Sequence, residues 1–151
     1  MVRTAIINAV KQFFDSQNWK YDFFEEEGMF QTAVGLTEES GVMIHAIVGE
    51  STLTVMTAAE LNAPEKLYPE ITAFVNDVNT RLLLGGLVFE CEEGILYFRL
   101  GQNCVNQAPN AQIVEDAFMY PISFMDENLD TFAQLFAGKL SAQAALERMF
   151  Q

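Results

Sequence analysis

The amino-acid sequence predicts an α+β protein with a twisted antiparallel sheet of about five strands and helices packed on it, in the order α-β-β-β-α-β-β-α-α. Short apolar segments with alternating polarity occur in two groups, and brief turn sequences separate the segments within each group. Connections this short join antiparallel strands. Segments with helical periodicity precede, separate and follow the two groups. A length of 151 residues suits one domain, so residues 1–151 are expected to share one core.

The first helix is predicted over residues 3–17, where Ile6, Val10 and Phe13 recur on one helical face. Alternating segments bounded by Gly, Ser and Glu then predict three strands, with a weaker strand before them. These strands cover residues 21–24, 29–37, 41–49 and 52–58.

A second helix is predicted over residues 64–83, because Ile71, Phe74 and Val78 lie on one helical stripe. The Gly-Gly pair at 85–86 ends it. This helix separates the first group of strands from the second.

A hairpin is predicted next, with strands at residues 87–91 and 95–101 and the Glu-Gly pair at 93–94 as its turn. This register would place Cys91 on the buried face of the sheet. Cys104 would then lie too far from Cys91 for a disulfide, so two free thiols in a reducing compartment are expected.

The remaining sequence is predicted to be helical. Residues 110–137 carry an apolar stripe, and Pro121 is expected to kink or split this helix. Gly138 suits the position just after a helix, and Ser141 suits the N-cap of a last helix.

The charge of the chain limits its partners. Eight Lys and Arg residues against 21 Asp and Glu residues give a net charge of −13. Such a surface repels phosphate backbones and anionic lipids, so neither nucleic acid nor a membrane is expected as a partner. The sequence shows no signal peptide and no apolar run long enough to span a bilayer, which predicts a cytoplasmic protein.

Strand alternation assigns side chains to two sheet faces. One face collects apolar side chains of both groups of strands and is expected to be the core. The other face mixes apolar and polar side chains: Met29, Met43, His45, Ile47, Met56, Tyr97 and Arg99. Its methionines offer the adaptable contacts found on binding surfaces. Two interpretations remain open: a second layer of helices covers this face, or a partner chain does.

Catalytic chemistry is not evident in the sequence. His45 is the only histidine and is expected in mid-strand, where a structural role is commoner than catalysis. One histidine and two distant cysteines do not make a zinc motif, and no nucleophile elbow occurs. We therefore predict no catalytic residue, metal or cofactor, and a protein that is not an enzyme.

The helix–Gly–hairpin unit resembles the YbjN-like family, described as putative bacterial sensory transduction regulators. The resemblance rests on the following residues: Asn76 and Asn79 in the helix, Gly86, Phe89-Glu90, and Gly94 followed by Leu96-Tyr97-Phe98-Arg99. It extends over nearly the whole chain. It implies a fold like that of type III secretion chaperones, often paired into dimers, with a non-enzymatic role in regulation or protein binding.

Asn76 and Asn79 share one side of their helix. They are expected either to bond to the backbone of the hairpin or to lie at a partner interface. The leading functional hypothesis is a homodimeric regulatory domain that binds protein through helix 64–83 and the methionine-bearing face. The alternative is a secretion-chaperone-like protein holding an extended client segment. A third hypothesis is a small-molecule-binding protein.

Overall fold

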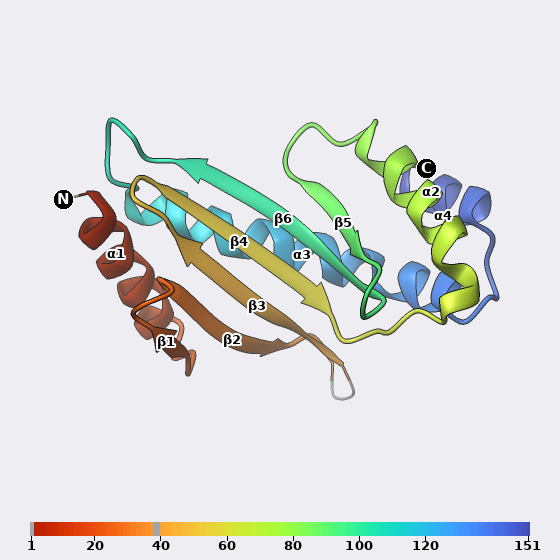
Figure 1. The fold of residues 1–151 in the computed structure, drawn as a ribbon, viewed down its shortest axis with the longest axis horizontal. Coiled ribbons are helices and arrows are strands. Elements are labelled where there is room, and N and C mark those ends of the chain that lie inside the picture. Colours follow the sequence, from red (N-terminus) through yellow and green to blue (C-terminus); the bar gives the residue numbers. More distant parts are fainter. Residues whose placement is uncertain (1, 38–39) are drawn as a thin grey trace.

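A computed structural model of the chain describes residues 2–37 and 40–151 and confirms the α+β class (Figure 1). The helices are α1 (Val2–Ser16), the 3-10 turn η1 (Glu65–Leu67), α2 (Tyr68–Asn79), α3 (Ala111–Phe136) and α4 (Ala142–Met149). The strands are β1 (Asp22–Phe24), β2 (Met29–Gly35), β3 (Gly41–Val48), β4 (Thr52–Ala59), β5 (Gly86–Glu90) and β6 (Ile95–Asn103). The weak predicted strand at 21–24 is thus present as β1.

All strands of the described residues join one antiparallel sheet with the order β1-β2-β3-β4-β6-β5. The first four strands form a meander. The chain then passes through α2 and returns as a hairpin whose second strand, β6, pairs with β4. This order puts β1 and β5 at the two edges of the sheet.

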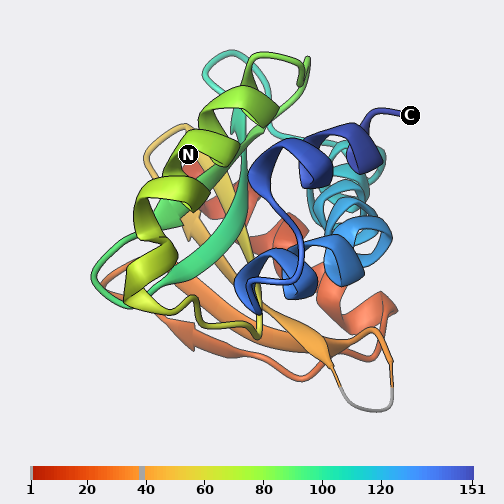
Figure 2. The same ribbon diagram turned by 90° about the vertical axis from the view of Figure 1, so that its right-hand side faces the viewer.

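Helices α1 and α3 pack on one face of the sheet, whereas α2 lies beside the edge strand β5 and packs against α4 (Figure 2). The Phe14 ring of α1 lies 5.5 Å from that of Phe30 in the sheet and 5.0 Å from that of Phe118 in α3, edge-on to both. This aromatic contact joins two helices and the sheet in the core. Fully burying a side chain of this size contributes roughly 1.5–3 kcal/mol.

Helix α3 runs without a break through Pro121, so the prediction that this residue could split the helix is wrong. Proline removes one backbone hydrogen bond. Ala117, Phe118, Ile122 and Met125 lie on both sides of it and are all buried against the rest of the core. Packing along the whole helix therefore outweighs the lost bond.

The ends of α3 and α4 follow their sequence signals. Gly138 adopts a positive φ of 75°, its N–H donates to the carbonyl of Leu135, and the N–H of Lys139 donates to Gln134. This pair of bonds is the Schellman arrangement. The Ser141 hydroxyl accepts from the N–H of Ala144 at 3.1 Å and caps α4.

The β5–β6 hairpin corrects the predicted position of Cys91, which is exposed rather than buried. The strands pair as Phe89 with Leu96, which leaves a four-residue loop instead of a two-residue turn. The Glu90 carboxylate stabilises this loop by accepting from the N–H groups of Glu92 and Glu93, at 2.7 and 2.8 Å. The register moves by two residues, so every strand residue keeps its predicted face.

Candidate functional site

Seven of the nine predicted surface residues lie together on the sheet face opposite the helices. We call this set the Met-bearing face: Met29, Met43, His45, Ile47, Met56, Tyr97 and Arg99. All of them are partly or fully exposed. In Figure 1 the strands lie in front of α3, with this face toward the viewer. Over the part of the chain that the structure describes, no helix layer covers it, so the first of the two interpretations of this face is wrong.

Cross-strand pairing arranges the face in rows. In the middle row, His45 lies opposite Met56, and Met56 lies opposite Arg99. Toward the β3–β4 turn, Phe24, Met29 and Ile47 are neighbours on successive strands. Phe24 is 40% and Ile47 is 38% exposed. We call these three residues the apolar strip.

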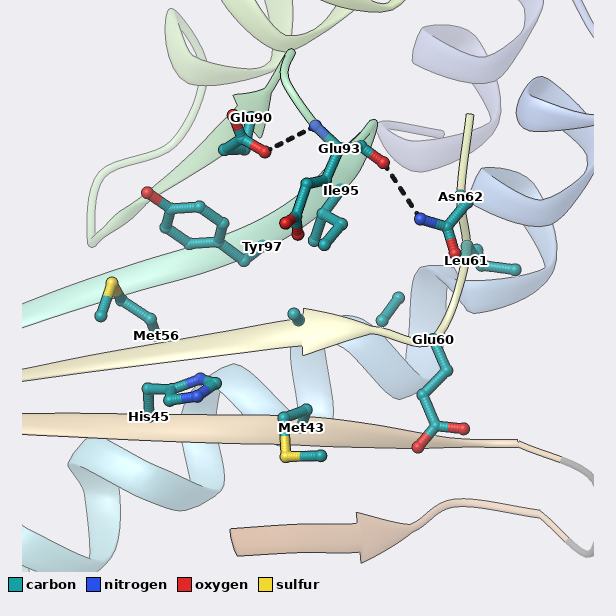
Figure 3. Close-up of a pocket in the computed structure, with 12 residues that line it drawn as sticks. Met43, His45, Met56, Glu60, Leu61, Asn62, Glu90, Glu93, Ile95 and Tyr97 are labelled. Carbon is teal, nitrogen blue, oxygen red and sulfur yellow. Dashed lines mark hydrogen bonds between the residues drawn. The ribbon is translucent and has the colours of Figure 1, made fainter. Parts of the chain in front are cut away.

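The other end of the face holds a hollow of about 470 Å³ (Figure 3). It lies between the end of β4, the linker at residues 60–62 and the β5–β6 loop. Its floor is mostly apolar, with one histidine: Met43, His45, Met56, Ala58, Ile95 and Tyr97. Its rim carries the carboxylates of Glu60, Glu90 and Glu93. We call this site the acid-rimmed hollow.

Backbone and side-chain bonds fix the rim in place. The Asn62 side-chain amide donates to the carbonyl of Glu93 at 3.0 Å, and the N–H of Ala63 donates to the carbonyl of Gly94 at 2.9 Å. These bonds tie the linker after β4 to the β5–β6 loop, two segments that are distant in sequence. The hollow is therefore bounded on two sides by connected backbone.

The charges around the hollow have one sign. Its lining contains three glutamates and no Lys or Arg. Both oxygens of Glu90 already accept backbone N–H bonds within the loop, whereas Glu60 and Glu93 come from two different segments and are exposed. The site thus offers an apolar floor and two carboxylates for recognition of a cation.

Asn76 and Asn79 lie on α2, beside the edge of the sheet and away from the Met-bearing face. The Asn79 side chain accepts from the N–H of Leu87 at 2.8 Å and donates to its carbonyl at 2.9 Å. For this residue, the predicted bonding to the hairpin backbone is confirmed. Asn76 is exposed, and its place at a partner interface stays a prediction.

Sequence reasoning missed several residues that line the hollow. Ile95 could have been found, because it alternates with Tyr97 along β6 and so shares its face. Glu60 and Asn62 lie in an irregular linker, where no periodicity signals the path of the chain.

Among the described residues, two titratable groups outside the hollow have shifted pKa values. Burial, with a smaller effect of the Asp15 charge, raises the pKa of Tyr21, and burial raises the pKa of the Cys104 thiol. In residues 2–37 and 40–151, no group of three His, Cys, Asp or Glu side chains could hold a metal ion. None of the helices described is long and apolar enough to cross a membrane.

The fold and the open face define a small α+β domain with one buried and one exposed sheet face. The profile of the YbjN family, described as "putative bacterial sensory transduction regulator", matches residues 7–134, so the chain belongs to this family. The resemblance seen in the sequence is confirmed. No curated protein matches the chain.

Among solved structures, the chain is similar to YbjN from E. coli, described as "a putative transcription regulator". The two share 14% sequence identity with a TM-score of 0.51, over 93% of this chain and 88% of that chain. At this identity the likeness shows the fold alone.

Proposed function

We propose that this chain is a non-enzymatic, cytoplasmic regulatory domain that binds another protein through its Met-bearing face and acts as a homodimer. One observation carries the proposal: an exposed sheet face holds three methionines, an isoleucine and a tyrosine, while the helices occupy the opposite face. A solvated sheet face is usually more polar. Contiguous apolar surface of this kind is typical of protein-binding sites.

The exposed apolar side chains of the apolar strip favour it as the centre of a dimer contact. Two copies repel each other, since each carries a net charge of −13. The strip of Phe24, Met29 and Ile47 has no charged member, and the glutamates of the hollow lie at the opposite end of the face. The exposed Glu25, Glu26 and Glu27 adjoin the strip in the turn between β1 and β2. Pairing centred on the strip brings apolar groups together and keeps the acidic rims apart.

The same charge argues for regulation through protein contacts rather than through direct binding of nucleic acid. A DNA-binding domain needs a basic patch to neutralise phosphates. Among the residues of the Met-bearing face, Arg99 is the one Lys or Arg side chain.

Light scattering on a sizing column tests the homodimer. We expect a dimer for the wild type and a monomer for Ile47→Glu, because a buried, unpaired carboxylate in the interface opposes association. Met119→Glu is the matched control, since Met119 is about equally exposed, at 36%, but lies on α3. A wild type that is monomeric at high concentration would contradict the homodimer.

Holding an extended client segment by strand addition is the second candidate, and one feature of β2 supports it. Strand β1 pairs only with Met29–Gln31 of β2. The N–H of Leu36 donates to Ser40 on the β3 side, so by alternation the backbone groups of Ala33 and Gly35 point outward. These groups offer a short open edge.

Hydrogen exchange tests the second candidate. Added client should slow exchange of the Ala33 and Gly35 amides, while unchanged exchange would exclude pairing at this edge. A thermal-shift panel of metabolites tests the third hypothesis, a small-molecule ligand: a saturable rise in melting temperature would support it.

A further inference from the structure

We infer that the acid-rimmed hollow receives a lysine or arginine side chain from an extended segment of a partner protein. The inference rests on the proposed function, because it takes protein binding through the Met-bearing face as given. It adds the chemistry by which the partner is recognised.

The lining of the hollow matches the two parts of a basic side chain. Lysine and arginine have an apolar stem and a cationic head. The stem would pack on Met43, Met56 and Tyr97, and the head would meet the carboxylates of Glu60 and Glu93. The ring of Tyr97 adds a face to which a cation is attracted.

The charge of the site excludes an anionic occupant. A carboxylate or phosphate would face three glutamates, with no Lys or Arg in the lining and His45 as its one histidine. A neutral apolar group would leave Glu60 and Glu93 without a partner. A cation gains from both carboxylates and, at long range, from the net charge of −13.

The size of the hollow favours a segment of chain over a single side chain. About 470 Å³ lies within the range of roughly 300–1,000 Å³ typical of small-ligand sites. In an extended segment, residues i and i+2 face the same side, about 7 Å apart. The hollow can therefore take a basic residue and the apolar residue two positions from it.

Hydrogen bonds within the protein hold the rim of the hollow in place before a partner binds. The Asn62–Glu93 and Ala63–Gly94 bonds hold the linker and the loop together. Little ordering is then needed on binding, which favours affinity.

NMR of the methionine methyl groups of the full chain tests the inference. The probe is the peptide acetyl-Ser-Arg-Ser-Leu-Ser-amide, compared with the same peptide carrying Gln in place of Arg. We expect saturable shifts of the Met43 and Met56 methyl signals with the Arg peptide. The signals of Met119 and Met149, which lie on α3 and α4, should not move.

A charge-neutralising pair of substitutions identifies the carboxylates. Glu60→Gln with Glu93→Gln should weaken binding of the Arg peptide about five- to tenfold, since exposed charge pairs contribute modestly. Glu92→Gln is the matched control, because Glu92 is exposed in the same loop and does not line the hollow. It should leave the affinity unchanged. Urea unfolding checks that all three substitutions leave the fold intact.

Three results would overturn the inference: equal binding of the Gln peptide, no effect of the double substitution, or equally tight binding of arginine amide alone. Equally tight binding of arginine amide would indicate that the hollow binds a free organic cation and not a protein segment. Light scattering on the same samples separates this inference from the homodimer. Peptide binding to a monomeric wild type would refute the dimer only, whereas a dimer without peptide binding would refute the inference only.

Discussion

Replacing Asn79 by alanine should destabilise the protein by about 2 kcal/mol. The Asn79 side-chain amide makes two hydrogen bonds to the backbone of Leu87, at 2.8 and 2.9 Å. Each bond of this kind contributes about 0.5–1.5 kcal/mol, so the pair contributes about 1–3 kcal/mol. Leu87 is only 2% exposed, which limits the water that could replace the lost partner.

Urea unfolding followed by circular dichroism measures this change. The midpoint should fall while the slope stays constant, because the amount of surface exposed on unfolding is unaltered. In a thermal scan, a loss of about 2 kcal/mol should lower the melting temperature by roughly 4–8 °C for a chain of this size. Hydrogen exchange of the Leu87 amide should also quicken, since its N–H loses its acceptor.

Asn76→Ala is the matched control, one turn earlier on the same helix and exposed. It should change the unfolding free energy by less than about 0.5 kcal/mol. If Asn79→Ala and Asn76→Ala have equal effects, Asn79 does not hold β5 against α2, and the argument from its two bonds is wrong.

Three further predictions concern single residues. Gly94→Ala should lower the free energy of unfolding in urea by roughly 2 kcal/mol, because Gly94 has a φ of +69° and an added Cβ would lie 2.8 Å from the carbonyl oxygen of Ala63. Gly101→Ala is the control and should change the free energy little, since a Cβ at Gly101 would meet open space. Thr57→Val should raise the unfolding free energy by about 1 kcal/mol, since the buried Thr57 hydroxyl has no hydrogen-bond partner among the described residues; an unchanged midpoint would contradict this. Iodoacetamide at pH 8 should label the exposed Cys91 and should label the buried Cys104 only after urea is added, as measured by mass spectrometry. Labelling of both cysteines in the native state would refute the burial of Cys104.

The raised pKa of Cys104 also has a consequence for stability. The native state holds the thiol proton more tightly than the unfolded state does. The contribution of this proton is complete below the ordinary thiol pKa and is lost as the pH rises through the higher native value. Cys104→Ser should remove this part of the pH dependence above about pH 9.

Strand alternation can be predicted from the sequence because it is a local property. The short β3–β4 turn sets the parity of its hairpin, and this parity places Met43, His45 and Met56 on one face. The position of Cys91 does not follow in the same way, because a Glu-Gly pair suggests a two-residue turn, whereas the Glu90 carboxylate stabilises a four-residue loop. The length of this loop is therefore decided by Glu90, a strand residue outside the loop.

Long-range packing explains what the sequence could not reveal. Helical periodicity shows that α1 and α3 each have one apolar stripe, but not that both stripes bury the same face of the sheet. The exposure of the Met-bearing face follows from this packing of both helices on the opposite face of the sheet. The rim of the hollow depends likewise on bonds between Asn62 and Glu93, which are 31 residues apart.

The unequal edges of the sheet bear on how large its assemblies can grow. A fibre that grows by strand pairing from one molecule to the next needs two unpaired strand edges in every molecule. At β5, the amide of Asn79 already occupies the outward N–H and carbonyl of Leu87. At the other edge, the backbone of β2 is open beyond β1. Asn79 thus obstructs strand pairing at Leu87, whereas no side chain of the described residues obstructs the β2 edge in the same way.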